Sequence, residues 1–210
     1  MVEVTRFVTG PIETNSYLLT DQNKKCLVFD PSSGCDEILG KIRTDKLFIE
    51  AVVLTHGHFD HIMGNAFVAS KWNVKTYIHM EDKLHLERAL HYSNMFGYKI
   101  EQPPLDSVDI NEGDILSFGN SSLKVLHTPG HTRGGVSFYN EEDKFVITGD
   151  ALFAGSIGRT DLPGGDYDQL MESLLGKIIK LGDDYTVYPG HGPATTIEKE
   201  ISSNPFLRYE

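Results

Sequence analysis

The chain has 210 residues, with 19 basic and 30 acidic side chains, and its formal net charge is -11 at pH 7. That length suits one domain with a substantial buried core, so we expect a single domain over residues 1–210. The acidic balance argues against a nucleic-acid backbone or an anionic membrane surface as the main partner. We therefore expect a small-molecule substrate, with the chain as a monomer or homodimer.

The cysteine content and the N-terminal residues bear on the compartment. Cys26 and Cys35 are the two cysteines of the sequence, too few for a disulfide framework. The first residues lack a basic region followed by an apolar run, and no segment approaches the roughly 18 apolar residues of a membrane-spanning helix. A cytoplasmic protein is the expectation.

The first half of the chain is predicted to form strands and then helices. Alternating or apolar runs bounded by turn residues are typical of strands, and they fall at residues 4–8, 16–19, 26–31, 51–54 and 74–79. The first three predict an antiparallel meander. Helices are expected over about 36–44 with Ser33 or Asp36 as the cap, over 60–72, and over about 81–92. Residues 97–109 contain Pro103-Pro104 and predict a loop near the site.

The second half repeats this order. Strands are expected at residues 115–118, 122–127, 135–139, 145–148 and 185–188. Residues 167–181 show the apolar spacing of an amphipathic helix, and a short C-terminal helix follows the last strand. Two facing sheets with helices on both outer faces, an αββα sandwich of the α/β class, fit this order. The pattern alone leaves a generic layered α/β fold open.

Ligand-type side chains gather at the ends of the predicted strands. Directly after residues 51–54, the segment from Thr55 to His61 contains His56, His58, Asp60 and His61. Three more ligand-type residues stand after predicted strands and beside glycine or proline, namely His131, Asp150 and His191. Seven such residues are enough for two metal ions.

The residue types explain the chemistry. Neutral imidazole and carboxylate suit a divalent first-row metal, and a catalytic site keeps one position open for water. Two ions about 3.5–4 Å apart can share a water and lower its pKa from about 15.7 to about 7. In an extended segment His56 and His58 project the same way, so one metal is assigned to this pair and the other to Asp60 and His61. We expect two divalent ions, zinc first, with iron or manganese as alternatives.

Packing alone explains any single histidine near a glycine, but not this clustering. A regulatory or purely metal-binding module without turnover is also disfavoured. A structural zinc site closes its coordination with four ligands, whereas seven candidates with a shared carboxylate leave room for water.

The string from His56 to His61, H-x-H-x-D-H, followed by a lone histidine, an aspartate and a final histidine, resembles the metallo-β-lactamase superfamily. The resemblance covers essentially the whole chain and implies the αββα sandwich with the site at one edge, between the sheets. It implies that the first metal is held by His56, His58 and His131, the second by Asp60, His61 and His191, and that Asp150 bridges them.

Departures within the superfamily narrow the subclass. Asp150 stands where zinc β-lactamases commonly have cysteine or serine, and His58 where flavodiiron proteins often have glutamate, so both activities are disfavoured. Superfamily members that process RNA usually carry a further nuclease or exosite domain, which 210 residues of acidic balance cannot hold, so RNA processing is not expected. Residues 128–132 and 149–161 look like the glyoxalase II-like thioester hydrolases, and residues 155–166 are especially similar to their short, single-domain branch.

The resemblance implies a binuclear metallohydrolase that cleaves a small thioester, an S-acylglutathione such as S-lactoylglutathione, to a hydroxy acid and a thiol. Longer glyoxalase II enzymes add a C-terminal helical domain for glutathione, whereas nineteen residues follow His191 here. Residues 158–161 also resemble persulfide dioxygenases, which use a single iron on the equivalents of His56, His131 and Asp150. Residues 162–165 favour hydrolysis. Hydrolysis of a lactone or another small ester is a further alternative.

Two residues receive roles beyond this set. Asp60 is expected to be a ligand that also orients the attacking hydroxide, which makes it the candidate catalytic residue. Arg159 matches an arginine near the site in the resembling families, and its planar fork suits a substrate carboxylate. A salt bridge to Asp161 or Asp166 is the alternative for Arg159. The remaining histidines are expected to be structural, namely His79, His85, His91 and His127.

Overall fold

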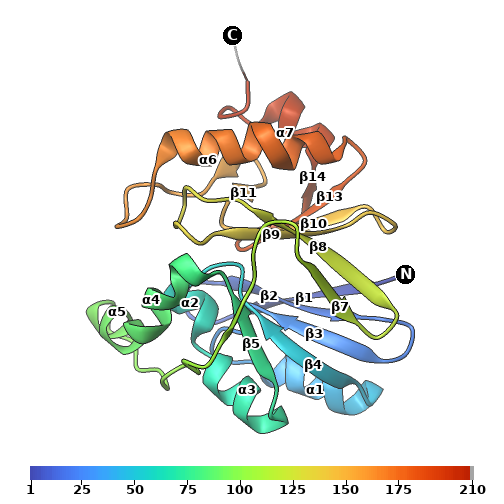
Figure 1. Cartoon of the computed structure of the whole chain (residues 1–210), viewed down its shortest axis with the longest axis vertical. Coiled ribbons are helices and arrows are strands. Elements are labelled where there is room, and N and C mark those ends of the chain that lie inside the picture. The colour runs from blue at the N-terminus through green and yellow to red at the C-terminus, as the bar shows by residue number, and fades with distance from the viewer. Residues whose placement is uncertain (209–210) are drawn as a thin grey trace.

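In the computed structural model, which describes residues 1–208, the strands form two six-stranded sheets that face each other (Figure 1). The first sheet has the strand order β1 (Glu3–Thr9), β2 (Thr14–Thr20), β3 (Lys25–Phe29), β4 (Phe48–Val53), β5 (Lys75–Ile78) and β6 (Val108–Asp109). The second has the order β14 (Thr195–Thr196), β13 (Thr186–Pro189), β10 (Phe145–Gly149), β9 (Val136–Asn140), β8 (Ser121–His127) and β7 (Ile115–Phe118). A small hairpin pairs β11 (Leu152–Phe153) with β12 (Ser156–Ile157).

Helices cover the outer face of each sheet (Figure 1). The first half contributes α1 (Asp36–Asp45), α2 (Phe59–Ile62), α3 (Asn65–Trp72), the 3₁₀ turn η1 (Met80–Asp82), α4 (Lys83–Glu87) and α5 (Ala89–Met95). Helices α1 and α3 lie on the outer face of the first sheet, whereas α4 and α5 lie beside its edge (Figure 1). Those of the second half are α6 (Tyr167–Ser173), which continues through a π turn η2 (Leu174–Ile178) and a 3₁₀ turn η3 (Ile179–Leu181), and α7 (Ile197–Ser203). The predicted αββα sandwich is confirmed. No described helix is long and apolar enough to cross a membrane.

Strand direction brings the ligand-bearing segments to one edge. The meander β1–β2–β3 is antiparallel as predicted, while β3, β4 and β5 run parallel to one another. Strands β10 and β13 of the second sheet are also parallel. Parallel strands release the chain at a common edge, where sites of α/β proteins form. Asp30 and Thr55 thus leave the first sheet together, and Asp150 and His191 leave the second.

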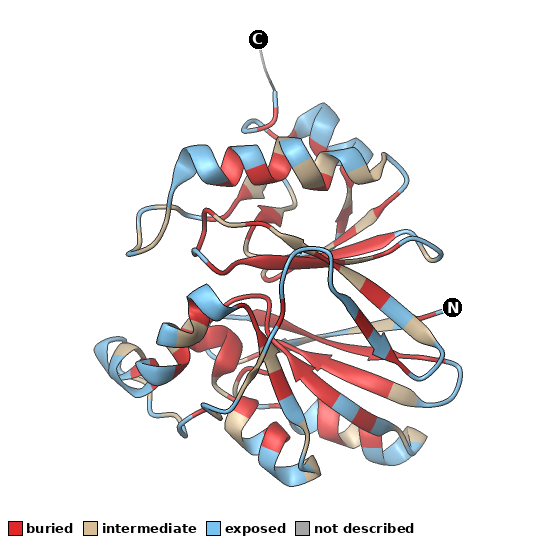
Figure 2. Cartoon of the chain, in the orientation of Figure 1, coloured by how far each residue is buried: buried red, intermediate tan, exposed pale blue. Residues whose placement is uncertain are grey.

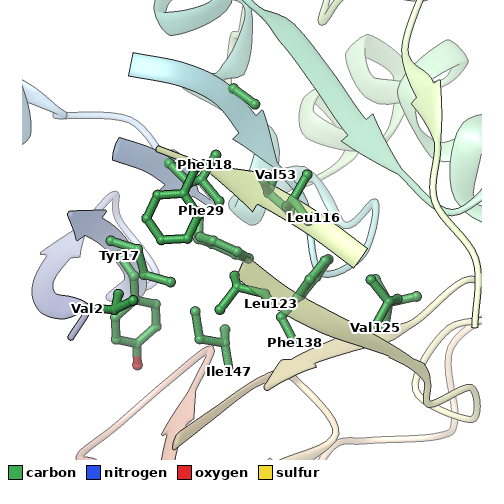
Figure 3. Close-up of a cluster of buried hydrophobic side chains, with 14 of the residues drawn as sticks. Val2, Tyr17, Phe29, Val53, Leu116, Phe118, Leu123, Val125, Phe138 and Ile147 are labelled. Atoms are coloured by element: carbon green, nitrogen blue, oxygen red, sulfur yellow. The ribbon is translucent and has the colours of Figure 1, made fainter. Parts of the chain in front are cut away.

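One hydrophobic core lies between the two sheets (Figure 3). Phe29 of β3 and Phe138 of β9 meet there edge to face, with ring centroids 5.1 Å apart. Strand β2 is buried on both faces, because Tyr17 and Leu19 join this core and Leu18 joins the core under the helices. Alternating side chains of one strand therefore connect two layers. In Figure 2 the strands in the middle of both sheets are largely red, the colour of buried residues.

Two predicted helices are interrupted. The helix expected over 60–72 breaks at Gly64, whose N–H donates to the Pro31 carbonyl at 2.8 Å. A Cβ at Gly64 would lie 2.4 Å from the Ser32 carbonyl oxygen, so the approach of that loop requires glycine. The helix expected over 81–92 is broken near Arg88. Predicting Ser33 or Asp36 as the cap of α1 was wrong, since Cys35 is its N-cap residue and makes no side-chain capping bond.

Candidate metal centre

The seven ligand-type side chains lie together at this edge. The first ligand group comprises His56, His58 and His131, and the second comprises Asp60, His61 and His191. Within each group the ligand atoms lie within 4.8 Å of one another, and Asp150 forms a further such set with His56 and His61. The arrangement matches the two sets implied by the sequence resemblance, and the metal-binding role of each residue remains a prediction.

Asp150 lies between the two groups. Its Oδ2 is 3.5 Å from His131 Nε2 and 3.7 Å from His191 Nε2, and its Oδ1 is 3.3 Å from His61 Nε2. One carboxylate thus faces ligands of both groups, which is the position that a bridging ligand needs.

The second ligand group is compact and is braced by β2. Asp60 Oδ2 lies 3.2 Å from His191 Nε2 and 3.4 Å from His61 Nε2. Thr14 Oγ1 donates to the same oxygen at 3.3 Å, and Thr14 also forms a β-bridge with His191. The first residues of β2 therefore hold a carboxylate of the first half against a histidine of the second half.

Three of the imidazoles have their outer nitrogen held by the protein. His61 Nδ1 bonds the buried Asp30 carboxylate at 3.0 Å, and His131 Nδ1 donates to the Arg159 carbonyl at 2.7 Å. Thr55 Oγ1 donates to Asp30, so it accepts from His56 Nδ1 at 3.1 Å. The Nε2 lone pairs of these rings then face the centre, as in metal sites whose ligands are oriented from outside. Sequence analysis missed Asp30, although its place at the end of a predicted strand was a signal.

The donor set fits a divalent metal. Among the described residues, His56 Nε2 and Asp150 Oδ1 are buried without a hydrogen-bonding partner. His58 Nδ1 lies 2.9 Å from His131 Nε2, and His61 Nε2 lies 3.3 Å from His191 Nε2. Nitrogen lone pairs directed at one another in a largely buried centre are costly unless a proton or a metal cation lies between them. Imidazole nitrogen and carboxylate oxygen are ligands that zinc, iron and manganese accept.

The two groups differ in charge. Burial lowers the pKa of His58 to about 3, and neighbouring His131 contributes. Burial also lowers the pKa of His56 well below its usual value, which keeps both rings neutral. Burial opposes a charge on His61 too, but Asp150 and Asp60 raise its pKa well above the usual range. The pKa values of both carboxyls are lowered despite their burial, with His61 as the main cause. Without metal, the second group thus holds a proton.

Arg159 contributes in a way that the sequence did not indicate. Its carbonyl orients His131, whereas its exposed guanidinium makes two hydrogen bonds of 2.7 Å with the Asp161 carboxylate. The salt bridge to Asp161, which was the alternative role for Arg159, is thus present. Asp166 instead caps α6 by accepting from the Gln169 N–H. Substrate binding by Arg159 stays a prediction.

Two further histidine environments lie near the centre, and the structural roles predicted for these residues stay predictions. His85 is half-buried, and its ring meets that of His58 at 5.4 Å, nearly perpendicular. His79 and His127 stack at 4.2 Å across the two sheets, and with Glu81 they form a separate cluster of ligand-type atoms. In that cluster His127 Nε2 donates to the Arg133 carbonyl at 2.8 Å and His79 Nδ1 accepts from the Glu81 N–H at 3.3 Å, so no metal is assigned to it.

Comparison with known proteins identifies the family. Residues 9–191 match the family model described as the Metallo-beta-lactamase superfamily. The chain belongs to this superfamily. Among superfamily relatives, the probable metallo-hydrolase YqgX of Bacillus subtilis is 39% identical over 204 residues, which are 96% of each chain. The hydroxyacylglutathione hydrolase GloC of Haemophilus influenzae is 35% identical over 209 residues, 99% of this chain and 96% of that protein.

Solved structures of the superfamily agree. BLEG-1, a B3 metallo-beta-lactamase, is 38% identical, with a TM-score of 0.91 over 98% of this chain and 99% of that one. TTHA1623 in a di-iron-bound form is 37% identical, with a TM-score of 0.89 over 97% of this chain and 100% of that one. ETHE1 from Myxococcus xanthus is 26% identical, with a TM-score of 0.79 over 97% of this chain and 83% of that one. The chain is thus a metal-dependent hydrolase by family.

Proposed function

We propose that this chain is a binuclear metallohydrolase that cleaves a small thioester, an S-acylglutathione such as S-lactoylglutathione, to a hydroxy acid and a thiol. The observation that carries the proposal is the likeness to GloC along nearly the full length of both chains. The position of Asp150 between the two ligand groups supports two metals rather than one.

The geometry gives each residue a task. Two divalent ions, zinc first and iron or manganese as alternatives, would supply a nucleophilic water at neutral pH and polarise the thioester carbonyl. The first group and the second would each hold one ion, with Asp150 shared. Asp60 Oδ2 is fixed by Thr14 and His191, so this carboxylate is placed to accept a hydrogen bond from the attacking water and set its direction.

Arg159 is the proposed contact for a substrate carboxylate. It follows Gly158, where a Cβ would lie 1.8 Å from the Asp150 carbonyl oxygen, so the loop presses against the centre at this point. The Arg159 guanidinium points away from the centre into solvent, where it pairs with the Asp161 carboxylate. A substrate carboxylate would replace Asp161 as the partner, an exchange between two similar charge-assisted pairs.

Other reactions are weighed by the same features. The likeness to ETHE1 keeps persulfide oxidation on a single iron as the alternative, and residues 162–165 favour hydrolysis. The likeness to BLEG-1 makes β-lactam hydrolysis a further alternative. Asp150 disfavours it, because zinc β-lactamases commonly have cysteine or serine at this position. A lactone or simple ester would use the same centre.

The test is thiol release from S-lactoylglutathione by protein purified with its native metals, which elemental analysis identifies. We expect metal-dependent release that His58→Ala abolishes and that His91→Ala, an exposed histidine outside the centre, leaves intact. Oxygen uptake on glutathione persulfide, opening of a cephalosporin and lactone hydrolysis are measured in parallel. A fully metallated protein that releases no thiol but performs one of these would overturn the proposal.

A further inference from the structure

A second buried carboxylate, Asp82, lies beneath the first ligand group. It ends η1, directly after β5, and its side chain is completely buried. No sequence motif points to a role for this residue. A buried carboxylate is costly unless several donors satisfy it, so its partners show what it supports.

The carboxylate of Asp82 joins two segments from different halves of the chain. Its Oδ2 accepts from the Gly57 N–H at 2.8 Å and from Thr132 Oγ1 at 2.8 Å. Its Oδ1 accepts from the Gly134 N–H at 2.8 Å. Gly57 lies between His56 and His58, and Thr132 directly follows His131. All three ligands of the first group thus stand next to a residue that donates to Asp82.

The two glycines are fitted to the Asp82 segment. A Cβ at Gly134 would lie 2.6 Å from the Asp82 backbone nitrogen, and a Cβ at Gly57 would lie 2.9 Å from the Asp82 carbonyl oxygen. Neither position has a positive φ, so the backbone conformation does not require glycine there. Glycine is required because the Asp82 segment approaches both positions closely. The same Cβ at Gly57 would lie 2.5 Å from the Cβ of His85, whose ring packs on His58. The η1–α4 segment is therefore packed directly on the ligand-bearing loops.

We propose that Asp82 is the positioning residue of the first ligand group. Its carboxylate sets the spacing between the His56–His58 segment and His131, and thereby the affinity of that position for a divalent metal. It acts through the backbone, through Thr132 and through the His85 ring, whose Nδ1 lies 3.6 Å from Asp82 Oδ1 and which packs on His58, and it makes no hydrogen bond to a ligand ring. The inference rests on the metal centre of the proposed function and is independent of the substrate.

The test is Asp82→Asn, which keeps the size of the side chain and removes its charge and one acceptor oxygen. Protein loaded with Zn²⁺ is dialysed against graded concentrations of a chelator, and the zinc retained per chain is measured. We expect affinity at one position to fall about 10- to 100-fold, the usual effect of losing an outer support, with the other position unchanged. Excess Zn²⁺ should restore turnover with an unchanged KM.

Double variants identify the affected position. With His58→Ala, which already weakens the first position, adding Asp82→Asn should release no further zinc. With His191→Ala, which weakens the second position, adding Asp82→Asn should release the remaining zinc. The opposite pattern would place the effect at the second group and overturn the proposal.

Asp21 is a matched control at the far end of the sandwich. It is nearly buried and accepts from the N–H groups of Asn23, Lys25 and Asn120, so it also joins the two halves. It follows β2, whose first residue lies at the metal centre, about 20 Å away by strand geometry. Asp21→Asn should lower the melting temperature of the metal-free protein but leave zinc affinity unchanged.

Equal zinc loss in the Asp21 and Asp82 variants, or two tightly held zinc ions in Asp82→Asn, would overturn the proposal. If Asp82→Asn does not fold, Thr132→Val removes one of the three hydrogen bonds at nearly constant shape. It should weaken the same position by a smaller factor, and unchanged zinc affinity in that variant counts against the proposal. Absence of thiol release with intact zinc binding would contradict the proposed function alone.

Discussion

The two ligand groups are supported by buried aspartates of different kinds. Asp30 bonds a ligand ring directly, at 3.0 Å from His61 Nδ1, and so fixes its tautomer and orientation. Asp82 bonds the chain around the ligands of the first group and so fixes the distance between two loops. Asp30 thus acts on a ring of the second group and, as a hydrogen-bond acceptor, contributes to the raised pKa of His61, whereas Asp82 acts on the loops that carry the first group. The following predictions, ordered from the largest effect to the smallest, test this comparison.

Asp150→Ala should weaken metal binding at both ligand groups at once and so remove the difference between them. Its carboxylate faces His131, His191 and His61, so we expect zinc affinity to fall by more than about 100-fold, beyond the loss of an outer support. Elemental analysis after dialysis measures the loss. Two tightly held zinc ions in this variant would contradict the bridging position.

Asp60→Ala should separate metal binding from chemistry. At saturating Zn²⁺, loss of the group that orients the attacking water should lower kcat by about 100-fold or more, with a smaller change in KM. Steady-state kinetics at matched metal content provide the measurement. Unchanged turnover at equal metal content would rule out the catalytic assignment.

Asp30→Asn should mirror Asp82→Asn at the other position. The second position should lose about 10- to 100-fold in affinity because the His61 ring loses its acceptor. A smaller effect at the first position is expected, since Asp30 also holds Thr55, the partner of His56. Chelator titration with His58→Ala and His191→Ala backgrounds distinguishes the positions. Equal losses at both would remove the contrast between the two aspartates.

The charge difference predicts proton release on metal binding. In the metal-free protein the pKa of His61 is raised above its ordinary value of 6.5, so protonation of His61 stabilises the fold. This contribution is fully present below pH 6.5. That contribution is lost as the pH rises through the raised value. Metal binding expels this proton, so affinity should rise with pH through neutrality and level off above the pKa of His61. Calorimetry in buffers of different ionisation enthalpy measures the release, and zero release at pH 7 would contradict the assignment.

Asp161→Asn should have the smallest effect. It frees the guanidinium of Arg159 from an exposed pair, and such pairs contribute at most about 1 kcal/mol. KM for a substrate that bears a carboxylate should therefore fall by less than about fivefold, while KM for a neutral thioester stays constant. A change of equal size for both substrates would argue against carboxylate binding by Arg159.

The seven ligand-type residues and the strands that precede them could be predicted from local rules, whereas the strand pattern left a generic layered α/β fold open and the sandwich was implied by the superfamily resemblance. Strand periodicity is read within a few residues, and His56, His131 and Asp150 each follow a strand beside a glycine or proline. The supports could not be found in this way. Asp82 gains its partners from segments 25 and 50 residues away, and the break at Gly64 is imposed by the Pro31–Ser32 loop. Arg159 has two acidic neighbours that look equivalent in sequence, and packing decides that Asp161 pairs while Asp166 caps a helix.

Each ligand group takes side chains from both halves of the chain, so an ion at either position would connect the two sheets. Binding only to the folded form stabilises it by mass action, by about 4 kcal/mol when free metal exceeds the dissociation constant a thousandfold. That is a large share of the usual stability of a domain. The melting temperature should therefore follow the free-metal concentration, and metal starvation would expose this protein to unfolding and proteolysis as well as stopping its chemistry.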